Sequence, residues 1–287
     1  MIQHKKWKSL GPVVLSALSF GIIFAMLEPL ARLLDPSLTL FASRGAGKIV
    51  QTILAISHVL LLLSLQPLSF LKTWFNQNIR FLGSTSWLKD FFTTFIIFFT
   101  LHSALLGSLW LAGYTHFNTA WGTLTGGLLA SMGFGFLATF MLAWTEELIF
   151  RGTVLPFLKQ FLSPLESIFW SALVFMLCHD FSNPLNLLTV DYKLGLGLFL
   201  LGFMLALIFH ISGKLYAGMG AHAGLVFVKV IMRRAPLLVY LPASQLPWFV
   251  NADLRQSFLV HALFVLVIVF LMIAYRDRLS NKPHLKA

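Results

Sequence analysis

Eight long apolar runs decide what this chain can fold into. A helix that crosses a bilayer needs about 20 mostly apolar residues, and the runs that meet this criterion lie near residues 12–34, 47–70, 88–113, 133–158, 164–187, 194–213, 214–234 and 257–275. Only 11% of the 287 residues are charged and 58% are hydrophobic, whereas roughly 25% of residues are charged in a soluble domain. We therefore expect an all-α, polytopic membrane protein of about eight transmembrane helices, with residues 1–287 in one integral membrane domain.

The basic residues predict how these helices are oriented. An even number of spans places both termini on one side of the membrane, and the majority of the 21 Lys and Arg residues then lie on the side of the termini. The positive-inside rule predicts that this side is cytoplasmic, and in a prokaryote the membrane would be the cell membrane. The basic residues form short groups at the ends of apolar runs, which favours membrane lipid as their partner and not nucleic acid.

Acidic residues are rare, and three of the ten lie inside apolar runs. An ionisable side chain in hydrocarbon is costly and usually marks a function. Glu28 lies in the first run, where a structural hydrogen bond and a role in a site are equally consistent with the sequence. Glu146 and Glu147 are adjacent in the fourth run and are followed by Arg151, so this run holds the strongest candidates for a functional site.

Helix geometry distinguishes the two adjacent glutamates. Glu147 and Arg151 are four residues apart with the acid first, which favours an ion pair on one helix face, and Arg can bind a carboxylate through two hydrogen bonds. Glu146 points about 100° away around the helix axis and has no partner on its own helix. An unpaired carboxylate in a poorly solvated site can act as a general base. The alternative is that Glu146 only bonds another helix.

Two histidines lie at similar depth in later runs. His179 lies about two thirds of the way along the run 164–187, and His222 lies near the centre of the run 214–234. Each alone is more typical of helix packing. Together with Glu146 they form a set that can deprotonate water and stabilise an oxyanion, with or without a metal ion. Small residues around His222 are expected to let its helix approach its neighbours closely; they are Gly218, Gly220, Ala221, Ala223 and Gly224.

Three short motifs occur in order within residues 133–234. Glu-Glu-x-x-x-Arg spans Glu146–Arg151, and Phe-x-x-x-His spans Phe175–His179. A third motif, in which Asn or a similar residue follows a His by four positions, is half present because Val226 follows His222. The chain thus resembles the type II CAAX prenyl endopeptidase class of membrane proteases, also called the CAAX protease and bacteriocin-processing family. We take residues 133–234 as the catalytic core helices.

This resemblance implies a fold, an activity and roles for the motif residues. It implies an eight-helix membrane fold with an intramembrane active site that is reachable from the cytosolic side. It also implies hydrolysis of a peptide bond in a membrane-associated protein or peptide, including lipidated substrates and those with a membrane-embedded segment. In this scheme Glu146 and His179 activate water and His222 helps to stabilise the oxyanion, while Glu147 and Arg151 form a structural ion pair.

The resemblance leaves the metal open, because family members have been described both as metalloproteases and as metal-independent glutamic proteases. A zinc ion held by Glu146, His179 and His222 is one alternative, and a site without metal is the other. The sole cysteine, Cys178, excludes a zinc site built from cysteines. The sequence also lacks His-Glu-x-x-His, the simplest metalloprotease arrangement.

Val226 is the main departure from the family pattern. An apolar side chain cannot donate a hydrogen bond to an oxyanion, and removal of one such donor typically lowers turnover by about 10²–10³. Asn183 and Asn186 are candidates to replace it. Val226 also keeps open a second hypothesis, a non-catalytic membrane protein with an immunity, chaperone or scaffold role. A proton-coupled transporter is the third hypothesis, which the lack of an internal repeat disfavours.

Overall fold

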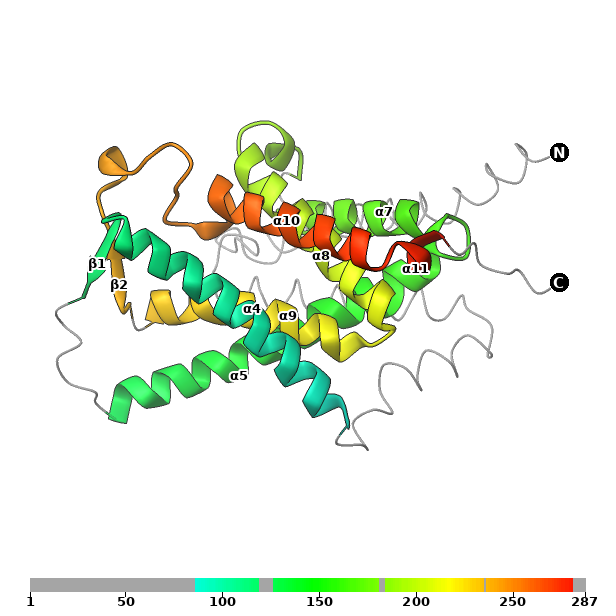
Figure 1. The fold of residues 1–287 in the computed structure, drawn as a ribbon, viewed down its shortest axis with the longest axis horizontal. Helices are drawn as coiled ribbons and strands as arrows, with labels where there is room; N and C mark the ends of the chain where they lie inside the picture. Colours follow the sequence, from blue (N-terminus) through cyan, green and yellow to red (C-terminus); the bar gives the residue numbers. More distant parts are fainter. Residues whose placement is uncertain (1–85, 119–125, 181–183, 235, 281–287) are drawn as a thin grey trace, which may run out of the picture.

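A computed structural model describes residues 86–118, 126–180, 184–234 and 236–280 (Figure 1). The predicted runs 12–34 and 47–70 lie outside the described residues, as does Glu28. The longer helices are α4 (Ser86–Leu111), α5 (Gly126–Ile149), α7 (Pro164–Leu177), α8 (Tyr192–Ser212), α9 (Leu215–Arg234) and α10 (Phe258–Ala274). The short elements are a π-helical turn at Phe150–Val154, α6 (Leu155–Leu158), α11 (Arg276–Ser280), 3₁₀ turns at Pro184–Leu188, Ala243–Gln245 and Leu254–Gln256, and strands β1 (Thr115–Phe117) and β2 (Leu238–Tyr240).

The described part of the chain is mostly helical and has the character of a multi-pass integral membrane protein. Four of its helical segments are long and apolar enough to cross a membrane: Trp87–Leu111, Leu129–Leu158, Tyr192–Ser212 and Leu215–Arg233. Helices α7 and α10 are apolar but shorter, with 14 and 17 residues. The total of eight spans stays a prediction. The expectation of an all-α fold is wrong in one detail, because β1 pairs with β2 in an antiparallel two-stranded sheet.

Contacts between distant segments define the two ends of the helix bundle. At one end, which we call the sheet end, β1 follows α4 and pairs with β2, which follows α9. At the other end, Lys214 Nζ lies 2.6 Å from Asp90 Oδ2 near the start of α4, and Arg278 donates a hydrogen bond to the carbonyl of Ile211. Figure 1 shows β1 and β2 at one end and α11 at the other. Because β1 and β2 lie at the same end of the bundle, their pairing is consistent with an even number of spans between them.

Helix α9 packs closely against α4 through two glycines. A Cβ atom on Gly220 would overlap the carbonyl oxygen of Phe91, and one on Gly224 would overlap that of Phe95. The prediction that small residues allow close approach of this helix is therefore confirmed at Gly220 and Gly224. The contact matters for the site, because His222 lies on α9 between these two glycines.

Substitution of Gly220 by Ala tests this contact. The added methyl group meets backbone of α4, which cannot rotate away, and overpacking of this kind typically costs about 1–3 kcal/mol. We expect Gly220→Ala to lower the free energy of unfolding in detergent by that amount. Gly107→Ala on α4 is the matched control, because its Cβ atom would meet nothing within 4 Å. Equal stability of the two variants would contradict the close contact.

Candidate active site

The local structure around Glu146 and Glu147 departs from a regular α-helix. Both residues lie in the last turn of α5, and the chain then forms a π-helical turn at Phe150–Val154 before α6. In this turn the amide of Leu155 bonds the carbonyl of Phe150, and the hydroxyl of Thr153 bonds the carbonyl of Leu148 at 3.1 Å. Single π-helical turns inside helices occur frequently at functional sites. Arg151 lies within this turn.

A fully buried ion pair joins Glu147 and Arg151. Both side chains have 0% exposure, and Arg151 Nη1 donates a hydrogen bond to Glu147 Oε1 at 2.9 Å. Arg151 Nη2 donates a second bond, at 2.8 Å, to the backbone carbonyl of Gly202 on α8. The guanidinium also lies over the ring of Phe175 on α7, 4.7 Å from its centroid. Arg151 therefore links α5 to both α7 and α8.

Glu147 has a further partner that the sequence did not reveal. His222 Nδ1 lies 3.0 Å from Glu147 Oε1, so one carboxylate oxygen accepts from Arg151 and from His222. Gly218, one turn before His222, makes room for this carboxylate, because a Cβ atom there would lie 2.8 Å from Glu147 Oε2. An ionised carboxylate only accepts hydrogen bonds, so His222 Nδ1 carries a proton and its Nε2 faces away from Glu147.

Glu146, His179 and His222 come together from three segments of the chain. Glu146 Oε2 lies 3.9 Å from His179 Nε2 and 3.8 Å from His222 Nε2. These distances are too long for direct hydrogen bonds, but one water-sized group can contact both the carboxylate and an imidazole. The side chains of Glu146 and His179 are 21% and 23% exposed, whereas that of His222 is 3% exposed. Glu146 and His179 are therefore partly exposed, although Glu146 Oε2 itself is buried and has no hydrogen-bond partner in the described part of the chain.

His179 is held in one orientation by the end of α7. Its Nδ1 lies 2.7 Å from the carbonyl of Phe175; because a carbonyl only accepts, Nδ1 carries the proton and Nε2 is an acceptor in the neutral ring. The imidazole also contacts the Phe175 ring, with centroids 4.5 Å apart. Helix α7 starts at a capping box in which Ser163 and Glu166 bond each other's backbone amides.

The predicted position of His179 within a spanning helix is wrong. The run 164–187 was expected to form one helix, but α7 ends at Leu177 and a 3₁₀ turn occupies Pro184–Leu188. Polar residues follow Leu177, namely His179, Asp180, Ser182 and Asn183, and Pro184 cannot supply an amide to continue a helix. Asn186 lies in the 3₁₀ turn, and Asn183 lies outside the described residues. Val226 lies one turn after His222 on α9 and is partly buried.

The arrangement does not match a preformed metal site. Among the described residues no group of three His, Cys, Asp or Glu side chains is placed to hold a metal ion. Ligands of a tetrahedral zinc ion bound at about 2.0–2.1 Å lie roughly 3.4 Å apart. The separations of 3.9 and 3.8 Å from Glu146 Oε2 to the two imidazoles exceed this value. We derive no chemical step through a metal ion from this geometry.

The fold and the cluster together define a class of protein: a helical membrane protein with a carboxylate and two imidazoles inside its helix bundle. Residues 127–228 match the family model described as "Type II CAAX prenyl endopeptidase Rce1-like", which places this segment of the chain in that family. The matched residues include Glu146, His179 and His222. Comparisons with curated proteins and with solved structures gave no match. Membership implies a protease that acts on a protein or peptide.

Removal of Arg151 tests the buried ion pair. Loss of one partner from a buried pair leaves the other charge without compensation and typically costs about 3–5 kcal/mol. We expect Arg151→Ala to lower the free energy of unfolding in detergent by this amount, because Glu147 and the Gly202 carbonyl both lose a donor. Arg276→Ala is the control, since the Arg276 side chain is 85% exposed. A similar effect of both substitutions would contradict a structural role for Arg151.

Proposed function

We propose that this protein is an intramembrane endopeptidase that hydrolyses a peptide bond in a membrane-associated protein or peptide. The observation that carries this proposal is the cluster in which Glu146 Oε2 lies within 4 Å of two imidazole Nε2 atoms from separate segments. Within the described part of the chain Glu146 forms no ion pair with a Lys or Arg, and a carboxylate next to two imidazoles supplies the groups that peptide hydrolysis needs, namely a base, an acid and a donor to the oxyanion.

Glu146 and His179 are proposed to activate the attacking water. A water molecule between Glu146 Oε2 and His179 Nε2 can donate one hydrogen bond to each, because both atoms are acceptors when His179 is neutral. Glu146 removes a proton as the water oxygen bonds to the peptide carbon, and the carbonyl electron pair moves onto its oxygen. The same proton then passes to the leaving nitrogen as the C–N bond breaks, so the base is regenerated.

His222 is proposed to stabilise the oxyanion through Nε2. To donate from Nε2 while Nδ1 donates to Glu147, the ring must carry both protons and a positive charge. Glu147 is placed to stabilise this charge, as the buried aspartate does for the histidine of a Ser-His-Asp triad. Glu147 is thus a positioning residue, which fixes the orientation of His222 and supplies the compensating charge. Arg151 in turn holds Glu147.

The second candidate function is a non-catalytic membrane protein of the same family, with an immunity, chaperone or scaffold role. Val226 favours it, because an apolar side chain stands one turn after His222 where the family pattern has a polar one. A Glu146→Ala, His222→Ala double variant distinguishes the two functions. Full complementation of a deletion strain by this variant would support the non-catalytic role, and failure to complement would support the protease.

Substitutions of the three cluster residues test the protease directly. We expect Glu146→Gln, His179→Ala and His222→Ala each to lower turnover by at least about 10²-fold, because each removes a proton-transfer group or an oxyanion donor. The measurement is a comparison of membrane proteomes for a precursor that accumulates in the variants, followed by cleavage of that precursor by purified protein. Asp277→Asn is the control, since this side chain is 96% exposed. Normal cleavage by purified Glu146→Gln protein would contradict the proposal.

A further inference from the structure

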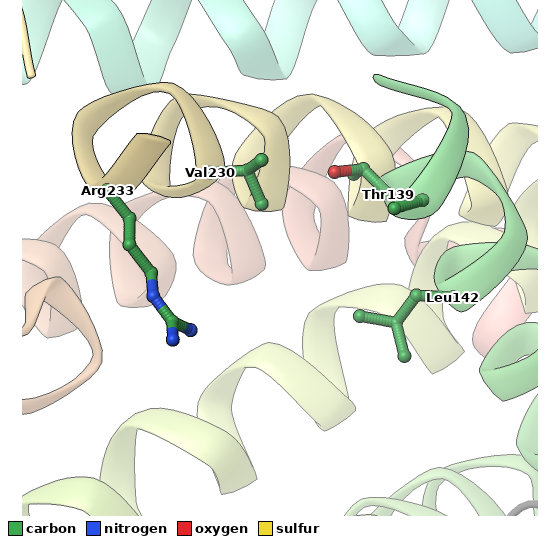
Figure 2. Close-up of a pocket in the computed structure, with 5 residues that line it drawn as sticks. Thr139, Leu142, Val230 and Arg233 are labelled. Atoms are coloured by element: carbon green, nitrogen blue, oxygen red, sulfur yellow. The ribbon is translucent and has the colours of Figure 1, made fainter. Parts of the chain in front are cut away.

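A cavity of about 400 Å³ lies between α5 and α9. It is lined by Ala138, Thr139, Leu142, Val230 and Arg233. Figure 2 shows Thr139 and Leu142 on one helix and Val230 and Arg233 on the other, with Leu142 and Arg233 extending into the same open space. None of these residues belongs to the three sequence motifs, so the cavity needs an explanation of its own.

The residues that line the cavity share helix faces with Glu146 and His222. Thr139 and Leu142 precede Glu146 by seven and four residues on α5, and this spacing places the three side chains on one helix face. Val230 and Arg233 follow His222 by eight and eleven residues on α9, which again is one face. The two faces that carry Glu146 and His222 therefore extend past the cluster and form the walls of the cavity. Both faces continue towards the sheet end of the bundle.

We propose that this α5–α9 groove binds an extended, apolar segment of the substrate, and that Arg233 pairs with a carboxylate on that segment about five residues from the scissile bond. Eleven residues of helix rise by roughly 16 Å from His222 to Arg233, and an extended peptide spans about 3.3 Å per residue. The ratio of these lengths sets the spacing of about five residues. The inference rests on the proposed protease function and specifies its substrate class.

The walls of the groove are suited to apolar side chains. Leu142 is 46% exposed, and Val230 is partly exposed beside it. Thr139 is buried, and its hydroxyl donates to the Gly135 carbonyl at 2.8 Å, so this proton is not available to a ligand. Val226 lies on the same α9 face, between His222 and Val230. Its apolar side chain, unexpected for the third motif, thus continues the apolar wall up to the cluster.

Among the residues that line the groove, Arg233 is a cation that can bind an anionic ligand. Nearby, Asp253 binds both Lys229, at 3.2 Å, and Arg255, at 2.7 Å. Burial raises the pKa of Asp253, but the hydrogen bonds and charge of Arg255 and the charge of Lys229 outweigh this effect and lower the pKa to about 2. Asp253 is therefore ionised and shared by these two cations. Arg233 is exposed and forms no ion pair with any residue in the described part of the chain.

Charge complementarity thus favours an anionic group at the Arg233 end of the groove. A lipid phosphate is an anion too, but a lipid would have no reason to follow the helix faces that lead to Glu146. A peptide in this groove places its backbone beside Glu146 and its carboxylate at Arg233 in one binding mode. The carboxylate can belong to an acidic side chain or to a chain terminus.

Binding to a Glu146→Gln variant in phosphatidylcholine nanodiscs tests this inference without requiring turnover. The probes are capped 12-residue Leu/Ala peptides that contain one Asp, Asn or Lys, together with the Asn peptide with a free C-terminal carboxylate. We expect the Asp peptide to bind about tenfold more tightly than the Asn peptide. Addition of Arg233→Glu should reverse the preference in favour of the Lys peptide. Arg276→Glu at the opposite end of the bundle is the matched charge reversal and should change nothing.

The outcomes separate this inference from the proposed function and from a lipid site. Equal binding of Asp and Asn peptides, in the presence and absence of Arg233→Glu, would overturn the groove even if Glu146 proves essential for cleavage. A preference for the free C-terminal carboxylate that is lost on Arg233→Glu would support the groove and assign the carboxylate to a chain terminus. An Arg233 effect seen only with phosphatidylglycerol, and equal for all peptides, would overturn the inference in favour of a lipid site.

Discussion

One buried carboxylate oxygen holds the site together. Glu147 Oε1 accepts from Arg151 at 2.9 Å and from His222 at 3.0 Å, and Arg151 also bonds α8 and lies over an aromatic ring of α7. Two donors from different segments thus converge on one atom where water does not reach. Loss of either bond would leave a buried charge or polar group unsatisfied, which is costly in a low-dielectric interior. The relative placement of four helices depends on this atom.

The adjacent glutamates have different surroundings because they point to different sides of α5. Glu147 is fully buried and paired with Arg151, whereas Glu146 is 21% exposed and lies within 4 Å of two imidazoles. The two are linked through His222, whose Nδ1 contacts Glu147 and whose Nε2 faces Glu146. The single imidazole of His222 thus lies between the buried carboxylate of Glu147 and the partly exposed one of Glu146. The π-helical turn that follows places Arg151 where it reaches both α7 and α8.

The sequence allowed local features to be predicted and left tertiary ones hidden. Glu147 and Arg151 are four residues apart on one helix, so their pairing follows from helix geometry alone. The bond from His222 to Glu147 spans 75 residues, and no spacing rule encodes it. The end of α7 at Leu177 was missed because the polar residues that follow it were counted within an apolar run of spanning length. The β1–β2 pair was missed because strands of three residues leave no periodic pattern.

The interpretation of Val226 changes once its surroundings in the structure are known. In the sequence it is a missing hydrogen-bond donor, which argues against catalysis. On α9 it lies one turn from His222 and one turn from Val230, between the cluster and a cavity with apolar walls. An amide there would add a polar group to a surface that otherwise favours apolar contact. The departure from the family pattern is therefore compatible with the proposed function, in which His222, positioned by Glu147, stabilises the oxyanion and Val226 contacts the substrate.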